Sequence, residues 1–126
     1  MSCFWDTLIK NIKKEDLTNI LNITTTKPLD FCNGLKGMNC KTENVLWNGS
    51  KITEKQYEEN IEWINEYQPN TISNGYDCST FDPFLFLIVE LFQIEIHHHY
   101  NGTMIHYQNK NPRYSIKIQS NKGHMW

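Results

Sequence analysis

The stretch "DPFLFLIVELFQIEIHHHYNGTMIHYQ", from Asp82 to Gln108, decides the fold of this 126-residue chain. Asp82 followed by Pro83 is typical of an N-cap and first helical turn, because a carboxylate accepts hydrogen bonds from the first N–H groups and proline fits the first turn. The following "FLFLIVELFQ" is apolar nearly all round, which is typical of a buried helix. We therefore expect a helix at the centre of the core.

After this helix the pattern changes to that of strands. The segments "IEIHHHY" and "TMIHYQ" flank Asn101-Gly102, the dipeptide that the type I′ turn of a two-residue β-hairpin favours. Further on, "RYSIKIQS" alternates apolar and polar residues and predicts a third strand. The expected fold class is α+β, with N-terminal helices and a buried central helix packed on a C-terminal antiparallel β-meander.

The first part of the chain has a helical pattern. Apolar residues recur there at spacings of three and four, which predicts a helix from Phe4 to about Lys14. Cys3 lies at the N-terminal end of this helix.

A second helix is expected in the middle of the chain. Thr53 and Gln56 fit a capping box, and the amphipathic stripe that follows them stops before Pro69. Residues 24–50 carry Pro28 and three glycines with no sustained period. We expect a long loop there, with one short helical turn.

Composition limits the domain count and the partners. With 39% hydrophobic residues, a chain of this length fits a single domain spanning residues 1–126. The formal charge of -2 and the scattered lysines give no basic surface, so we expect no nucleic-acid partner. The longest apolar run is far shorter than the roughly 20 residues of a membrane span, and no signal peptide is evident. We expect a cytoplasmic protein with reduced cysteines and no membrane partner.

The histidines of the hairpin admit two interpretations. Counting back from the turn puts His97 opposite His106, with His99 on the same face. Three imidazoles and a water can hold a catalytic zinc ion. The opposite face of the hairpin is apolar and is the obvious core side, so we expect these three side chains to point to solvent, with no metal or cofactor. His98 falls on the apolar face and is expected to be a packed, hydrogen-bonded core residue.

Cys3 and His124 are the candidate catalytic pair. A thiol in the first turn of a helix gains from the N–H groups and the positive end of the helix dipole, which stabilise a thiolate. Cysteine peptidases keep their nucleophile in such a place, and a histidine from elsewhere in the fold acts as general base. His124 follows the third predicted strand, beside Trp126. From spacing alone, a buried and inert Cys3 fits equally well.

Three segments resemble the ovarian-tumour (OTU) family of cysteine peptidases, particularly the small OTU-like proteins of large DNA viruses. "CFWDTL" is similar to the nucleophile helix, "GYDCSTFDPFLFLIVELFQIEI" to a loop, central helix and strand, and "SIKIQSNKGHMW" to the strand that carries the catalytic histidine. The resemblance implies an OTU-like cysteine protease fold with Cys3 as nucleophile and His124 as general base. It also implies deubiquitinase-like activity on ubiquitin or a ubiquitin-like protein, in the host cytoplasm or associated with a virion.

Two points stay open at this stage. Asn74, Asp77 and Asn121 are candidates for a third catalytic group by their chemistry, although each also fits a turn. In the family, an Asp-Gly-Asn motif directly precedes the catalytic cysteine and belongs to the loop whose N–H groups form the oxyanion hole. This motif does not precede Cys3, which favours the alternative of a catalytically inactive OTU-like binding or virion-associated module. We expect the enzyme, because the helix-start thiol and the strand-end histidine both occupy the matching places.

Overall fold

Residues 3–121 and 124–126 are described in the computed structural model, apart from the side chains of residues 73, 74 and 124. The elements run in the order α1 (Cys3–Asn11), α2 (Lys14–Leu21), α3 (Pro28–Gly37), β1 (Val45–Trp47), α4 (Glu54–Glu66), η1 (Pro69–Asn74), α5 (Pro83–Phe92), β2 (Glu95–Tyr100), β3 (Thr103–Asn109), β4 (Ser115–Asn121) and β5 (His124–Met125).

The central helix α5 forms where the sequence predicts it. The Asp82 carboxylate accepts hydrogen bonds from the N–H groups of Phe84 and Leu85 and so caps the first turn. Residues 84–89 are all fully buried, as the apolar sequence of the helix indicates. Gln93 takes a left-handed conformation (φ 57°), which ends the helix and turns the chain into β2.

The hairpin prediction is also confirmed. Asn101 and Gly102 both have positive φ (45° and 89°), as a type I′ turn requires. The register pairs Tyr100 with Thr103, and this brings His97 opposite a second histidine on β3.

The expected antiparallel meander is wrong in one respect. The strand order is β1-β3-β2-β4-β5, and β4 runs parallel to β2. One edge of β3 is paired with β1 and the other with β2. The chain therefore crosses past the end of β2, and β4 pairs with the free edge of β2. Two hydrogen bonds hold it there: Arg113 N–H donates to the Gln93 carbonyl, and Glu95 N–H donates to the Tyr114 carbonyl. The sheet is therefore mixed.

The long loop predicted for residues 24–50 is wrong as well, because α3 and β1 lie within it. Pro28 occupies the first turn of α3, where its missing N–H costs nothing. Phe31, Cys32 and Leu35 are completely buried on one face of this helix. This burial outweighs the two glycines in α3, each of which costs a helix about 1 kcal/mol relative to alanine.

The first helix is shorter than expected, and a separate helix follows it. α1 ends at Asn11 rather than near Lys14, and α2 begins at Lys14. α2 buries Leu17, Leu21 and the carboxylate of Asp16. A helix this short has no sustained apolar stripe that would predict it from the sequence, because its position depends on contacts with distant residues.

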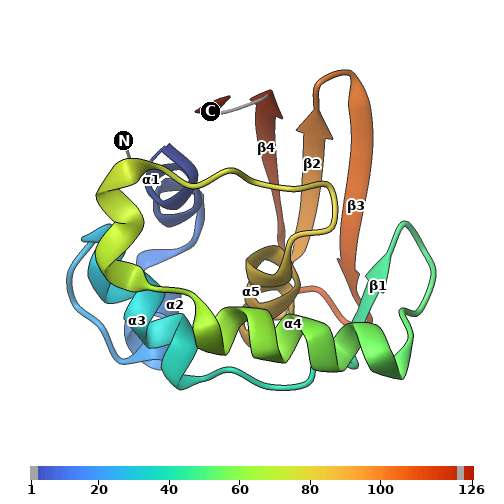
Figure 1. Ribbon diagram of the computed structural model, residues 1–126, viewed down its shortest axis with the longest axis horizontal. Coiled ribbons are helices and arrows are strands. Elements are labelled where there is room, and N and C mark those ends of the chain that lie inside the picture. The colour runs from blue at the N-terminus through green and yellow to red at the C-terminus, as the bar shows by residue number, and fades with distance from the viewer. Residues whose placement is uncertain (1–2, 122–123) are drawn as a thin grey trace.

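Figure 1 shows the helices gathered on one face of the sheet. Burial alternates strictly along β4, whose residues Ile116 and Ile118 face the helices. The α+β class is thus as predicted, and the described residues form one small domain. No helix within the described ranges is long and apolar enough to cross a membrane.

Candidate active site

Cys3 is the first residue of α1 and is partly buried. The two residues after it fix the first turn, because Phe4 and Trp5 are buried in the core. The first N–H groups of a helix have no partner within the helix, so they are available to a negative group at this end. None of the four cysteines, all within the described residues, forms a disulfide.

The backbone of His124 lies in β5, the last strand of the sheet. β5 is antiparallel to β4, with His124 paired to Asn121 and Met125 paired to Ser120. β5 also packs against α1, and Figure 1 shows the two ends of the chain at the same edge of the molecule. The elements that contain the two candidate residues are therefore neighbours, whereas the side chain of His124 lies outside the described residues.

The three candidates for a third catalytic group differ in position. The side chain of Asn74 lies outside the described residues. Asp77 is exposed in the loop before α5, and Asn121 is exposed at the end of β4. Of these, Asn121 is next to His124 in the backbone pairing.

The loop before α5 is held against the beginning of α1 by Tyr76. The Tyr76 ring packs on the Phe4 ring, with 4.2 Å between centroids. Its hydroxyl donates to the Asp82 carboxylate, at 2.9 and 3.0 Å from the two oxygens. Asp82 is therefore both the cap of α5 and the anchor of this loop. The sequence indicates the cap, but nothing in it marks Tyr76 as the partner.

Asp82 is almost completely buried, and the burial raises the pKa of its carboxyl to about 6. Hydrogen bonds from the Ser79 N–H, the Tyr76 hydroxyl and two N–H groups of α5 act in the opposite direction, because they favour the ionised form. The backbone N–H of Asp82 donates to the Tyr107 hydroxyl, which in turn donates to the Thr80 carbonyl. The start of α5 and the loop thus share one buried polar network.

The histidine pair of the hairpin is located where the register predicts. The rings of His97 and His106 lie edge to face, with 4.7 Å between centroids, and Nε2 of His97 is 3.7 Å from a carboxylate oxygen of Glu95. Within the described part of the chain, no group of three or more His, Cys, Asp or Glu residues could hold a metal ion. Burial lowers the pKa of His98 to about 4, and its Nε2 is 2.5 Å from Ser120 Oγ. His98 is the buried, hydrogen-bonded core residue that the sequence predicts.

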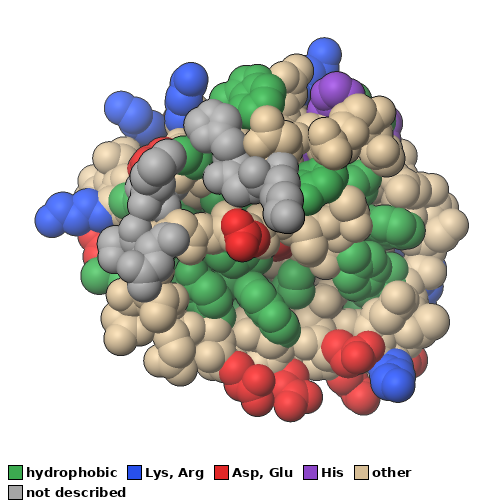
Figure 2. All heavy atoms as spheres, turned by 45° about the horizontal axis from the view of Figure 1, so that its top comes forward, with side chains coloured by type: hydrophobic (Ala, Val, Ile, Leu, Met, Phe, Trp, Pro, Cys, Tyr) green, Lys and Arg blue, Asp and Glu red, His purple; other side chains and the backbone are tan. Residues whose placement is uncertain are grey.

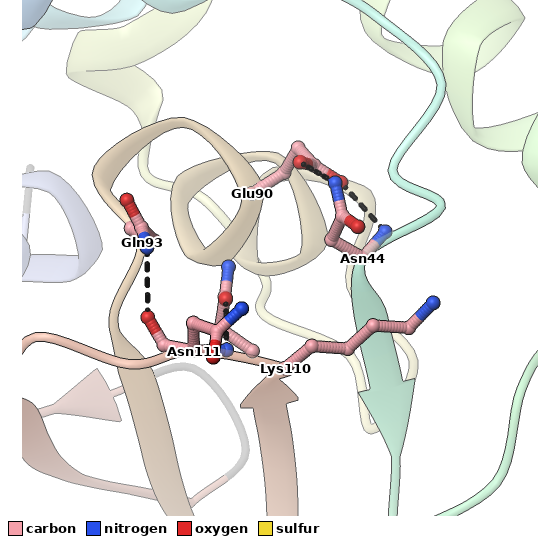
Figure 3. Close-up of a pocket in the computed structure, with 6 residues that line it drawn as sticks. Asn44, Glu90, Gln93, Lys110 and Asn111 are labelled. Carbon is pink, nitrogen blue, oxygen red and sulfur yellow. Dashed lines mark hydrogen bonds between the residues drawn. The ribbon is translucent and has the colours of Figure 1, made fainter.

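At the end of the sheet away from the Asn101-Gly102 turn, a polar pocket of about 230 Å³ lies between the end of α5, the start of β1 and the end of β3. Figure 3 shows both carboxylate oxygens of Glu90 engaged by Asn44 and Gln93 bonded to the Asn111 carbonyl. Because its acid and two of its amides hold the elements together, this pocket is a structural junction.

Comparison with known proteins gives no relative: the chain matches no protein-family model, no curated protein and no solved structure.

Proposed function

We propose that this protein is a cysteine protease with deubiquitinase-like activity, in which Cys3 is the nucleophile and His124 the general base. The observation that carries the proposal is the contact between α1 and β5. It joins the helix that starts with a cysteine to the strand that contains a histidine, although they come from opposite ends of the sequence. The substrates would be isopeptide or peptide bonds of ubiquitin or a ubiquitin-like protein.

The chemistry follows from these two groups. His124 takes the proton of the Cys3 thiol, and the sulfur forms a bond to the carbonyl carbon of the substrate. The C–N bond then breaks, and His124 gives the proton to the leaving amine. Water attacks the resulting thioester, the C–S bond breaks, and the carboxylic acid and the thiol are released.

The surroundings of Cys3 support this role. The helix start can stabilise the thiolate, and the buried Phe4 and Trp5 keep the first turn in place. Tyr76 packs on Phe4 from the loop before α5, so this loop lies against the first turn of α1, which begins at Cys3.

The test is incubation with ubiquitin that carries a C-terminal electrophile. We expect a covalent adduct on Cys3, which disappears in Cys3→Ala and forms more slowly in His124→Ala. Cys78→Ala is the matched control, since burial raises the pKa of that thiol, and it should form the adduct normally. The proposed protease activity of Cys3 is refuted if the adduct persists in Cys3→Ala, or if the folded wild-type protein forms no adduct. The second outcome would favour the catalytically inactive binding module.

A further inference from the structure

The exposed side of α4 concentrates the negative charge of the chain. The helix contains five of the 14 acidic residues and one lysine, while the whole chain has a formal net charge of only -2. All five glutamates are exposed to solvent. In the orientation of Figure 2, acidic side chains form a row along the lower edge, below a stretch of hydrophobic surface.

This arrangement is unfavourable for the helix itself. Glu58 and Glu62, and likewise Glu62 and Glu66, are four residues apart, and each such like-charged pair destabilises a helix by about 0.2–0.5 kcal/mol. The last turn contains no basic residue, and Glu66 lies at the carbonyl end, where the helix dipole disfavours a negative charge. The stability of α4 therefore does not explain these glutamates.

The rest of the protein compensates this charge only in part. Lys41 forms an ion pair with Glu54, at 2.9 Å, near the start of the helix. Lys36 Nζ donates to the backbone carbonyls of Asn65 and Tyr67. It therefore caps the C-terminal end of the helix and does not pair with a glutamate. Among the described residues, no ion pair involves a glutamate at positions 58–66.

A tryptophan stands beside these glutamates. Trp63 is 43% exposed and follows Glu59 by one helical turn. Its ring stacks on Tyr67 at 5.7 Å and meets Tyr76 and Phe84 edge to face at 6.0 and 5.7 Å. An indole that packs against three other rings and is still 43% exposed is suited to bind an apolar side chain or the cation of an arginine.

We propose that Glu58, Glu59, Glu62, Trp63 and Glu66 form a docking surface for a basic segment of a partner protein that carries an apolar side chain among its arginines or lysines. Charge complementarity identifies this occupant, because within the described part of the chain the four glutamates form no ion pair and the indole beside them is 43% exposed. The proposal goes beyond the proposed hydrolysis, since binding on α4 requires neither Cys3 nor His124.

The test uses a fluorescein-labelled decapeptide in which arginines flank one leucine, and a twin with glutamate in place of each arginine. Fluorescence anisotropy should show binding of the arginine peptide, weakened by added salt, and no binding of the twin. Glu62→Lys with Glu66→Lys should weaken binding about tenfold. Trp63→Ala should weaken it too, whereas Cys3→Ala should leave it unchanged.

The matched control reverses two exposed charges elsewhere, Glu15→Lys with Glu43→Lys, and changes the net charge by the same amount. This control should bind the arginine peptide within about twofold of wild type. Equal affinities of the wild-type protein and the α4 double variant overturn the proposal, as does an equal loss in the control. Absence of binding to wild type also overturns it. Self-association that the α4 substitutions abolish would identify a second copy as the occupant instead.

Discussion

At the scale of single residues, Asp82 has an unusual effect on stability. Its carboxyl is buried, and the raised pKa of about 6 compares with about 3.9 for an exposed aspartate. The folded protein thus binds the proton more tightly than the unfolded chain does. The contribution of Asp82 to the free energy of unfolding is fully present below about pH 4 and is lost as the pH rises to about 6.

Replacement of this carboxyl should remove that pH dependence. Between pH 4 and pH 7, the free energy of unfolding should fall by about 2 kcal/mol less in Asp82→Asn than in wild type. The measurement is urea denaturation at both pH values, and only the difference between the proteins matters, because other carboxyls titrate in both. Asp77→Asn, in the same loop but exposed, should keep the wild-type profile. Parallel profiles for wild type and Asp82→Asn would contradict the prediction.

The four thiols should differ in reactivity. Burial raises the pKa of Cys32 to about 12, and it also raises the pKa of Cys40 and of Cys78. We therefore expect iodoacetamide at pH 7.5 to label Cys3 first, as followed by mass spectrometry of the digested protein. His124→Ala should slow labelling of Cys3 if the two groups interact, whereas His99→Ala should not. Equal labelling of all four thiols would exclude an activated Cys3.

At the scale of elements, one buried carboxylate joins three segments that are far apart in sequence. Asp16, on α2, accepts hydrogen bonds from the Tyr114 hydroxyl at 2.6 Å and from Arg113 Nη2 at 3.0 Å. The same guanidinium nitrogen donates to the Phe92 carbonyl at the end of α5. Burial raises the pKa of Asp16, but the hydrogen bonds and the charge of Arg113 outweigh it, so that the net direction is downward.

Loss of the Tyr114 hydroxyl should weaken this junction. Tyr114→Phe should lower the free energy of unfolding by about 1–3 kcal/mol at pH 7, because a buried carboxylate loses a donor. A lowered carboxyl pKa gives stability that is present above the unfolded value, near 3.9, and is lost as the pH falls. The deficit should therefore shrink below about pH 4 in chemical denaturation. Tyr100→Phe is the control and should stay within about 0.5 kcal/mol of wild type, and an equal loss there would contradict the assignment.

At the scale of the whole molecule, local signals predicted most of the elements. The Thr53 and Gln56 capping box, the Asp82 cap and the Asn101-Gly102 turn depend on neighbouring residues, and all three form as expected. These features fix where helices and turns begin, so the sequence reveals them directly.

Long-range choices could not be predicted in the same way. The edge of β2 that β4 takes depends on β1 covering the outer edge of β3, and the three residues of β1 are too short a run to predict that pairing. α2 and α3 depend on burial against distant helices. For the candidate site, the sequence suggested Cys3 and His124, which stay predictions, and it correctly predicted the Asp82 cap. The packing of Tyr76 on Phe4 could not be predicted, because it arises only when the loop before α5 folds back.

The parallel pairing of β4 with β2 imposes an order on folding. A hairpin such as β2–β3 closes within microseconds, because its strands are adjacent in sequence. β4 pairs with the edge of β2 that the hairpin leaves free, and the hydrogen bond to α2 from Tyr114, just before β4, to Asp16 spans 98 residues. Contacts of such separation close large loops and form late. The surface shared by α1 and β5 joins segments that are far apart in sequence, so we expect it to form late, once β4 and β5 have joined the sheet.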